Sequence, residues 1–132
     1  MIGYVTLGTN DLAKAREYYD ALLGSIGAKR LMEFPDEIGG FTLWGTGWGS
    51  PGIALTRPYN GNAAVAGNGN MVAIVMDSRD KVDALHARAL ELGGSDEGAP
   101  GVRGEEGPRA FYGAYFRDPE GNKICAFRIG PG

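Results

Sequence analysis

The stretch that decides the fold lies close to the C-terminus and reads YFRDPEGNKIC, from Tyr115 to Cys125. Its two ends have the composition of strands, and the segment between them contains Pro119 and Gly121, which are typical turn residues. The stretch therefore predicts a strand, a tight turn and a second strand. We expect this closing hairpin to run over 110–116 and 123–129.

The first half of the chain predicts one helix among short strands. Apolar residues recur at spacings of three and four positions after Asn10, which is placed to cap a helix over 11–23. Short apolar runs bounded by glycine, proline and other turn residues indicate the strands. These predicted strands are 2–8, 30–34, 41–45 and 52–57.

The second half repeats the same order of elements. An apolar strand is expected over 70–76, and Ser78 is placed to cap a helix that ends before Gly93. A short strand at 95–97 and a glycine-rich loop at 98–108, which has the composition of a mobile lid, precede the closing hairpin. The order strand, helix and three strands therefore occurs twice.

This repeat predicts an α+β fold of two βαβββ modules, 1–62 and 68–132, within a single domain. The linker between them is polar and rich in turn residues. Each module alone would expose one face of its sheet. Two such sheets packed edge to edge would form a curved mixed-sheet cup that can enclose a ligand.

Composition excludes several classes of protein. The chain has 132 residues, 43% of them hydrophobic, and a net charge of -3, so nothing in its charge points to nucleic acid as a partner. One cysteine rules out an internal disulfide and a cysteine-rich zinc site. No apolar run reaches the ~20 residues of a membrane span. We expect a cytoplasmic protein with no membrane partner and, because small domains often associate, a homodimer.

The order and spacing of these pieces resemble the vicinal oxygen chelate superfamily, which includes glyoxalases, bleomycin-resistance proteins, fosfomycin-resistance enzymes and ring-cleaving dioxygenases. The resemblance covers almost the whole chain. It rests on the opening strand MIGYVTLG, the helix start Asn10-Asp11-Leu12 with Tyr18-Tyr19-Asp20, the second helix from Ser78 to Gly93-Gly94, and the closing hairpin. It implies the glyoxalase/bleomycin-resistance/dioxygenase fold, and relatives that commonly form twofold dimers.

The resemblance also identifies the positions at which metal-using members bind a divalent cation. Those members have His or Gln, Glu, His and Glu there, whereas this chain has Tyr4, Ala54, Met71 and Cys125. Hard divalent cations prefer carboxylate and imidazole donors, which none of these four residues supplies. We therefore predict that the chain lacks the family metal and has no other cofactor.

The resemblance and the strand alternation together predict which residues line the ligand pocket. The expected lining is apolar and aromatic with a few hydroxyls, which suits a small aromatic or amphipathic molecule. Trp48 is an alternative to Trp44, depending on the register of the third strand. The predicted lining residues are Tyr4, Thr6, Trp44, Ala54, Met71, Phe111, Tyr115, Cys125 and Phe127.

Other polar residues have two interpretations each. Cys125 is either a buried small apolar side chain or a nucleophile, and the former is favoured because no histidine is placed to activate it. His86, the one histidine, is either a packing or hydrogen-bonding residue at a contact between helix and sheet, which is favoured, or a catalytic residue. Arg103 and Arg109 either clamp an anionic ligand or face solvent.

The sequence is compatible with three functional hypotheses. The first is a metal-independent superfamily member that binds a small organic molecule, with or without a reaction. The second is a metal-dependent lyase or dioxygenase of the glyoxalase type. The third is a sequestration protein of the drug-resistance kind, for which tight binding is the whole function. Whether the chain is an enzyme stays open, because the fold alone does not determine a reaction.

Overall fold

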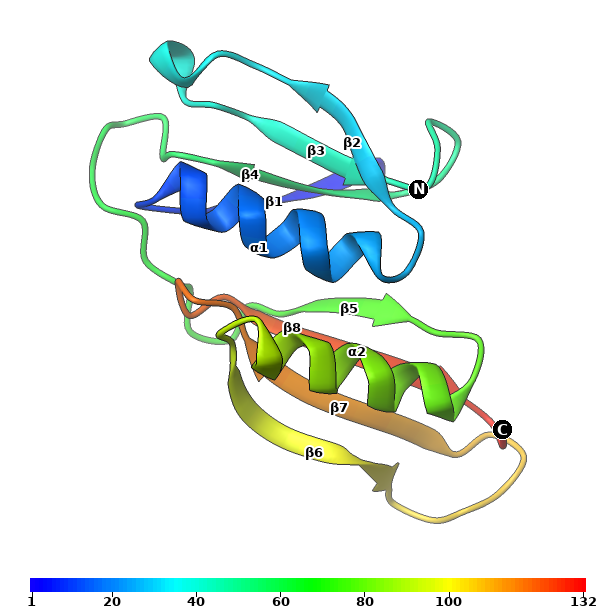
Figure 1. The fold of residues 1–132 in the computed structure, drawn as a ribbon. Coiled ribbons are helices and arrows are strands. Elements are labelled where there is room, and N and C mark those ends of the chain that lie inside the picture. The colour runs from blue at the N-terminus through cyan, green and yellow to red at the C-terminus, as the bar shows by residue number, and fades with distance from the viewer. The chain divides into compact units, whose positions relative to one another are not determined.

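The computed structural model describes residues 1–132, and the chain divides into two compact units, Met1–Gly67 and Asn68–Gly132. Figure 1 shows that each unit consists of a twisted sheet with one helix lying along it. Each unit has the element order strand, helix and three strands, and a four-stranded sheet that is not closed. The predicted α+β fold of two βαβββ modules is therefore confirmed.

The sheet of the first unit is mixed and has the strand order β1-β4-β3-β2. Strand β1 pairs in parallel with β4, and the other neighbours are antiparallel. A short 3-10 turn, η1, lies between β2 and β3. The elements are β1 (Tyr4–Gly8), α1 (Leu12–Gly24), β2 (Lys29–Glu33), η1 (Asp36–Ile38), β3 (Thr42–Gly45) and β4 (Gly52–Thr56).

Helix α1 is capped by Asp11, not by Asn10 as the sequence predicted. The Asp11 side chain accepts a hydrogen bond of 3.1 Å from the Lys14 amide. Asn10 instead binds the backbone of Ala64: its amide nitrogen donates to the Ala64 carbonyl, and its oxygen accepts from the Ala64 amide. Asn10 therefore fixes the segment that follows β4 to the first unit.

The core of the first unit lies between α1 and one face of its sheet. Tyr19 and Leu22 of α1 are buried against that face, together with Leu55 of β4 and Trp44 of β3. The Trp44 ring contacts the Tyr19 ring at 5.9 Å between centroids. The opposite face of the sheet is not covered by any helix of this unit (Figure 1).

The second unit repeats this layout with strand order β5-β8-β7-β6. Ser78 caps its helix as predicted, accepting from the Lys81 amide. His86, on the same helix, is buried, binds Asp96 at 2.9 Å and contacts the buried Phe116 ring, which confirms its expected place between helix and sheet. The elements are β5 (Val72–Val75), α2 (Arg79–Glu91), β6 (Ser95–Arg103), β7 (Phe111–Arg117) and β8 (Lys123–Ile129).

The predicted glycine-rich loop at 98–108 is largely a strand. Strand β6 continues to Arg103 and pairs with β7, with register irregularities between Asp96 and Gly98 and between Gly98 and Gly101. Bulges of this kind let a strand with many glycines stay paired while its direction changes. The prediction of a lid over the whole segment is therefore wrong, because its first half belongs to the sheet.

The closing hairpin is confirmed, with β7 and β8 paired antiparallel. Its turn depends on Asp118, whose buried carboxylate accepts hydrogen bonds from the amides of Glu120 and Asn122 and from the Asn122 side chain. Gly121 adopts φ 94°, a left-handed conformation that favours glycine. Neither helix of the fold is long and apolar enough to cross a lipid bilayer.

Candidate functional site

The open face of the first sheet is defined by strand register. Tyr4 and Thr6 of β1 lie beside Gly52 and Ala54 of β4, and Ala54 lies opposite Leu43 of β3. Paired residues project from the same side of a sheet, so these five positions share the face that α1 does not cover. The sequence-predicted residues Tyr4, Thr6 and Ala54 therefore lie on one face.

An apolar groove of about 550 Å³ is hollowed into this face. Three of its aromatic rings follow one another: Tyr4 meets Phe41 edge-on at 5.6 Å, and Phe41 lies 5.8 Å from Phe34. Large apolar side chains are thus held at the surface. The groove is lined by Gly3, Tyr4, Leu31, Met32, Phe34, Ile38, Phe41, Leu43, Gly47, Trp48, Ser50, Gly52, Thr56 and Tyr59.

Gly52 creates space on the floor of the groove. A Cβ atom at this position would lie 2.7 Å from the Trp44 carbonyl oxygen and 2.8 Å from the Leu43 side chain. Contacts this short do not occur for real side chains, and one of the two involves backbone that cannot easily move. Glycine at position 52 therefore lets Leu43 lie across the floor.

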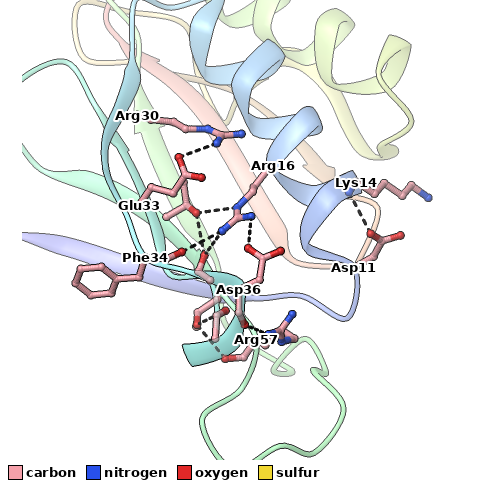
Figure 2. A network of polar contacts seen from close by, with 12 residues as sticks. Asp11, Lys14, Arg16, Arg30, Glu33, Phe34, Asp36 and Arg57 are labelled. Atoms are coloured by element: carbon pink, nitrogen blue, oxygen red, sulfur yellow. Dashed lines mark hydrogen bonds and ion pairs between the residues drawn. The ribbon is translucent and has the colours of Figure 1, made fainter.

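Arg16 of α1 holds the segment that forms one wall of the groove. Its guanidinium donates to the Thr42 hydroxyl, the Asp36 carboxylate and the backbone carbonyls of Phe34 and Gly40, as Figure 2 shows in part. Arg57 adds a hydrogen bond to the Asp36 carbonyl. Arg16 reaches this segment from α1, on the covered side of the sheet. The Phe34 and Phe41 side chains can therefore line the groove on the open face.

Trp44 does not line the open face, contrary to the sequence prediction. Its side chain is 1% exposed, and its Nε1 donates to the Asp20 carboxylate of α1 at 2.9 Å. Partial burial of Asp20 opposes its ionisation, but hydrogen bonds from Arg30 and Trp44 outweigh it and keep its pKa below the ordinary value. Trp48, which follows β3 and is 68% exposed, lines the groove instead.

A second hollow in the first unit is not a candidate ligand site. It lies beside α1 and is lined by Ala13, Arg16, Glu17, Asp20, Ala21 and Arg30. Its two arginines are already paired, Arg30 with Asp20 at 2.8 Å and Arg16 with Asp36 at 2.7 Å. Paired charges on a helix side are a surface network and not a ligand site.

The open face of the second sheet brings together four predicted residues. The register places Tyr115 opposite Cys125, and Gly113 opposite Phe127. Phe111 stacks on Phe127 with 5.5 Å between ring centroids and 7° between planes. Met71 lies just before β5 and is partly exposed. Phe111, Tyr115, Cys125 and Phe127 thus share one face, as the strand alternation predicts.

Cys125 is a poor nucleophile in this position. Burial raises the pKa of its thiol above the ordinary value and outweighs the Tyr115 hydrogen bond and the charges of Arg103 and Lys123, which lower it. The thiol is fully buried and lies 3.6 Å from the Ala126 carbonyl oxygen. At neutral pH it is therefore protonated, and it behaves as a small buried side chain.

The residues at the family's metal positions do not fit a divalent cation. In the first unit these positions supply the Tyr4 phenol and Ala54, which has no donor atom. In the second unit they supply the Met71 thioether and the protonated Cys125 thiol. Nowhere in the chain do three or more His, Cys, Asp or Glu side chains gather in a metal-binding cluster. No step of a reaction can be assigned to such a metal from these donors.

Several groove residues were not predicted from the sequence, notably Phe34, Phe41, Leu31 and Met32. Phe34 and Phe41 fell at the ends of the predicted strands 30–34 and 41–45 and were not assigned to the pocket, whereas the structure places both just outside β2 and β3. The register irregularity between Arg30 and Met32 changes which side chains of β2 reach the open face. The aromatic pair that flanks the turn at 35–40 was the available sequence signal.

Comparison with known families assigns the chain to a superfamily. The family model described as Glyoxalase/Bleomycin resistance protein/Dioxygenase superfamily matches residues 1–126. The chain therefore belongs to this superfamily. A comparison with curated proteins finds no match.

Solved structures agree with this assignment. A glyoxalase/bleomycin resistance protein from Albidiferax ferrireducens T118 is 36% identical, with a TM-score of 0.79, and the alignment covers 97% of this chain and 98% of that one. A glyoxalase/bleomycin resistance protein/dioxygenase family enzyme from Burkholderia phytofirmans PsJN is 20% identical, with a TM-score of 0.69 and coverage of 96% and 97%.

A lactoylglutathione lyase from Agrobacterium tumefaciens has the same fold. It is 21% identical to this chain, with a TM-score of 0.66 and coverage of 97% and 92%. At this level of identity the likeness concerns the fold alone.

Proposed function

We propose that this protein binds a small organic molecule with a flat apolar body on the open faces of its sheets, without the superfamily's divalent metal. The observation that carries the proposal is the aromatic groove of the first unit. Trp48 and Ile38, both 68% exposed, belong to it together with the Tyr4–Phe41–Phe34 row.

Exposed apolar surface that is concentrated in a groove requires an explanation. Burying such surface is favourable by about 25 cal/mol per Å², so a ligand that covers the rings gains affinity. The groove volume of about 550 Å³ lies within the usual range for small-molecule sites. Its polar groups are few, with Ser50 and Thr56 among them, which suits a ligand that is mainly apolar.

The chemistry of the site favours binding over catalysis. The donors at the family's metal positions provide no Lewis acid site, and Cys125 is protonated and buried. His86, the one histidine, is engaged with Asp96 beside α2. These observations support sequestration of a small molecule more than a lyase or dioxygenase reaction, which remains the alternative.

We expect a flat neutral probe such as indole to bind the groove. In a ¹H–¹⁵N NMR titration, the indole N–H signal of Trp48 should shift and that of the buried Trp44 should stay fixed. Trp48→Ala should weaken binding about tenfold, because the ligand can no longer stack on that ring. Thr46→Ala, at an exposed neighbour outside the groove, is the matched control. Equal effects of the two substitutions would contradict the proposal.

We also propose that the chain forms a homodimer. Each sheet has edge strands, β1 and β2 in the first unit and β5 and β6 in the second. Unpaired strand edges and exposed apolar residues such as Ile2, Val75 and Ile129 favour association. Light scattering at micromolar concentration should report twice the mass of one chain. A stable monomer under those conditions would rule the dimer out.

A further inference from the structure

Two cations without a carboxylate partner lie on the open face of the second unit. The guanidinium of Arg103, on β6, lies 5.4 Å from the centroid of the Tyr115 ring, and the Lys123 ammonium, on β8, lies 5.5 Å from it. Tyr115 is on β7, the strand between them. The three side chains therefore form a positively charged group that spans three strands.

Four cations of this unit, Arg79, Lys81, Arg88 and Arg117, have a carboxylate partner, whereas Arg103 and Lys123 have none. Arg117 forms an ion pair with Glu97, and Arg79 binds Glu106 at 2.6 Å. Arg103 and Lys123 form no ion pair. Two like charges are thus held near one ring with no anion between them.

Arg103 is fixed in place by the backbone. Its Nη1 donates to the Gly101 carbonyl at 2.9 Å and its Nη2 to the Ala99 carbonyl at 2.7 Å. A guanidinium has five N–H donors, so others remain for a ligand. An arginine held in this way loses little further conformational freedom on binding.

Glycines make this position of Arg103 possible. A Cβ at Gly98 would lie 2.9 Å from the Tyr115 ring and 3.2 Å from Arg103 Nη2, and one at Gly101 would lie 3.3 Å from Arg103 Nη1. Both glycines are on β6, at its register irregularities. The sequence pattern that suggested a lid thus makes room for a guanidinium on the sheet.

A flat apolar platform lies on the same face. The register places Gly113 opposite both Gly101 and Phe127, and the stacked Phe111 and Phe127 rings cover this region. A Cβ at Gly113 would lie 2.5 Å from the Phe111 ring. Glycine at this position therefore allows the Phe111 ring to lie flat over the sheet. An aromatic ligand can therefore stack close to the two cations.

The neighbouring acidic groups do not cancel the positive charge. Burial, with the neighbouring Cys125 thiol, raises the pKa of Tyr115 above its ordinary value, and burial raises the pKa of Cys125. At neutral pH the phenol and the thiol are both uncharged. The charge of the group is therefore that of Arg103 and Lys123.

We propose that Arg103 and Lys123, with Tyr115 between their strands, form an anion-binding site for the carboxylate or phosphate group of a small flat molecule whose apolar body lies on Phe111 and Phe127. Arginine suits this role because its planar fork matches carboxylate and phosphate oxygens. The inference rests on the proposed function in taking the open face of this sheet as a ligand-binding face. It adds the charge and class of the ligand.

The first experiment compares ligands of one shape and different charge on the intact protein. Benzoate, phenyl phosphate, benzamide and benzylamine are titrated separately and followed by ¹H–¹⁵N NMR. Benzoate and phenyl phosphate should bind about tenfold more tightly than neutral benzamide, the effect of about one charge-assisted hydrogen bond, and benzylamine should bind more weakly than benzamide. The relative affinities of benzoate and phenyl phosphate indicate which anionic group the site prefers.

The second experiment uses variants that remove one charge each. Arg103→Gln and Lys123→Gln should each weaken benzoate binding about tenfold and leave benzamide binding unchanged. Arg109→Gln is the matched control, because Arg109 is an exposed arginine of the same unit with no ion pair, and it should change benzoate binding less than about twofold. Arg103→Gln could disturb the bulged strand β6, to which Arg103 belongs. Lys123→Gln tests the same site from β8 and does not depend on that strand.

The outcomes separate this inference from the proposed function. Equal affinity for benzoate and benzamide, or equal losses in Arg103→Gln and Arg109→Gln, would overturn the anion site and leave small-molecule binding in place. Failure of every ligand to bind this face, with indole still bound by the groove, would also overturn it. Failure of indole and of the whole benzoate series would overturn both.

Discussion

Trp44→Ala is expected to lower the free energy of unfolding by about 3–5 kcal/mol, the usual cost of removing a large buried aromatic side chain. Trp44 is 1% exposed, contacts Tyr19 and is the partner of Asp20 at 2.9 Å. The substitution leaves a cavity under α1 and removes a hydrogen bond from a partly buried carboxylate. Urea unfolding followed by circular dichroism measures the change.

The matched control is the second tryptophan. Trp48→Ala removes the same side chain from an exposed position in the groove, and we expect a change in unfolding free energy of less than about 0.5 kcal/mol. Indole binding should show the reverse order, with the larger loss in Trp48→Ala. Similar destabilisation by both substitutions would show that the assignment of the two rings to opposite faces is wrong.

Asp118→Ala is expected to cost about 2–4 kcal/mol, because a buried carboxylate that organises a turn is lost. The Asp118 side chain accepts from the amides of Glu120 and Asn122 at 3.0 and 2.9 Å and from the Asn122 side chain at 3.0 Å. Its removal leaves backbone donors of the turn without these acceptors. Hydrogen exchange should be fastest in the variant at the ends of β7 and β8 that adjoin the turn.

Pro119→Ala is the control for this turn. Pro119 is exposed and adjoins Asp118, and its replacement is expected to cost less than about 1 kcal/mol. If Pro119→Ala were as damaging as Asp118→Ala, the stability of the hairpin would depend on the rigidity of the proline and not on the carboxylate.

The order of elements could be predicted from sequence because local signals agree along this chain. Ser78 marked the start of α2, and the turn at Pro119 and Gly121 located the closing hairpin. The glycines of β6 misled the prediction, since glycine favours loops by local propensity, whereas here pairing with β7 prevails. Asn10 misled it in a similar way, because its partner Ala64 lies far along the sequence.

The candidate site was less predictable than the fold. Alternation placed Phe111, Tyr115, Cys125 and Phe127 on one face correctly, since β7 and β8 pair without irregularity. It could not decide between Trp44 and Trp48, because the face of Trp44 depends on the register of β3 and Trp48 lies after that strand, where alternation does not apply. The packing of Arg103 on Tyr115 depends on a bulged register that no local pattern encodes.

The central claim is that this superfamily member binds a small organic molecule without the family metal, and native mass spectrometry combined with elemental analysis tests it most directly. The purified protein should carry a non-covalently bound organic molecule, or take one up, and should hold far less than one divalent metal ion per chain. Added EDTA should leave its melting temperature unchanged, because no metal-linked stabilisation is lost. One tightly held Zn, Ni, Fe or Mn ion per chain would contradict the claim.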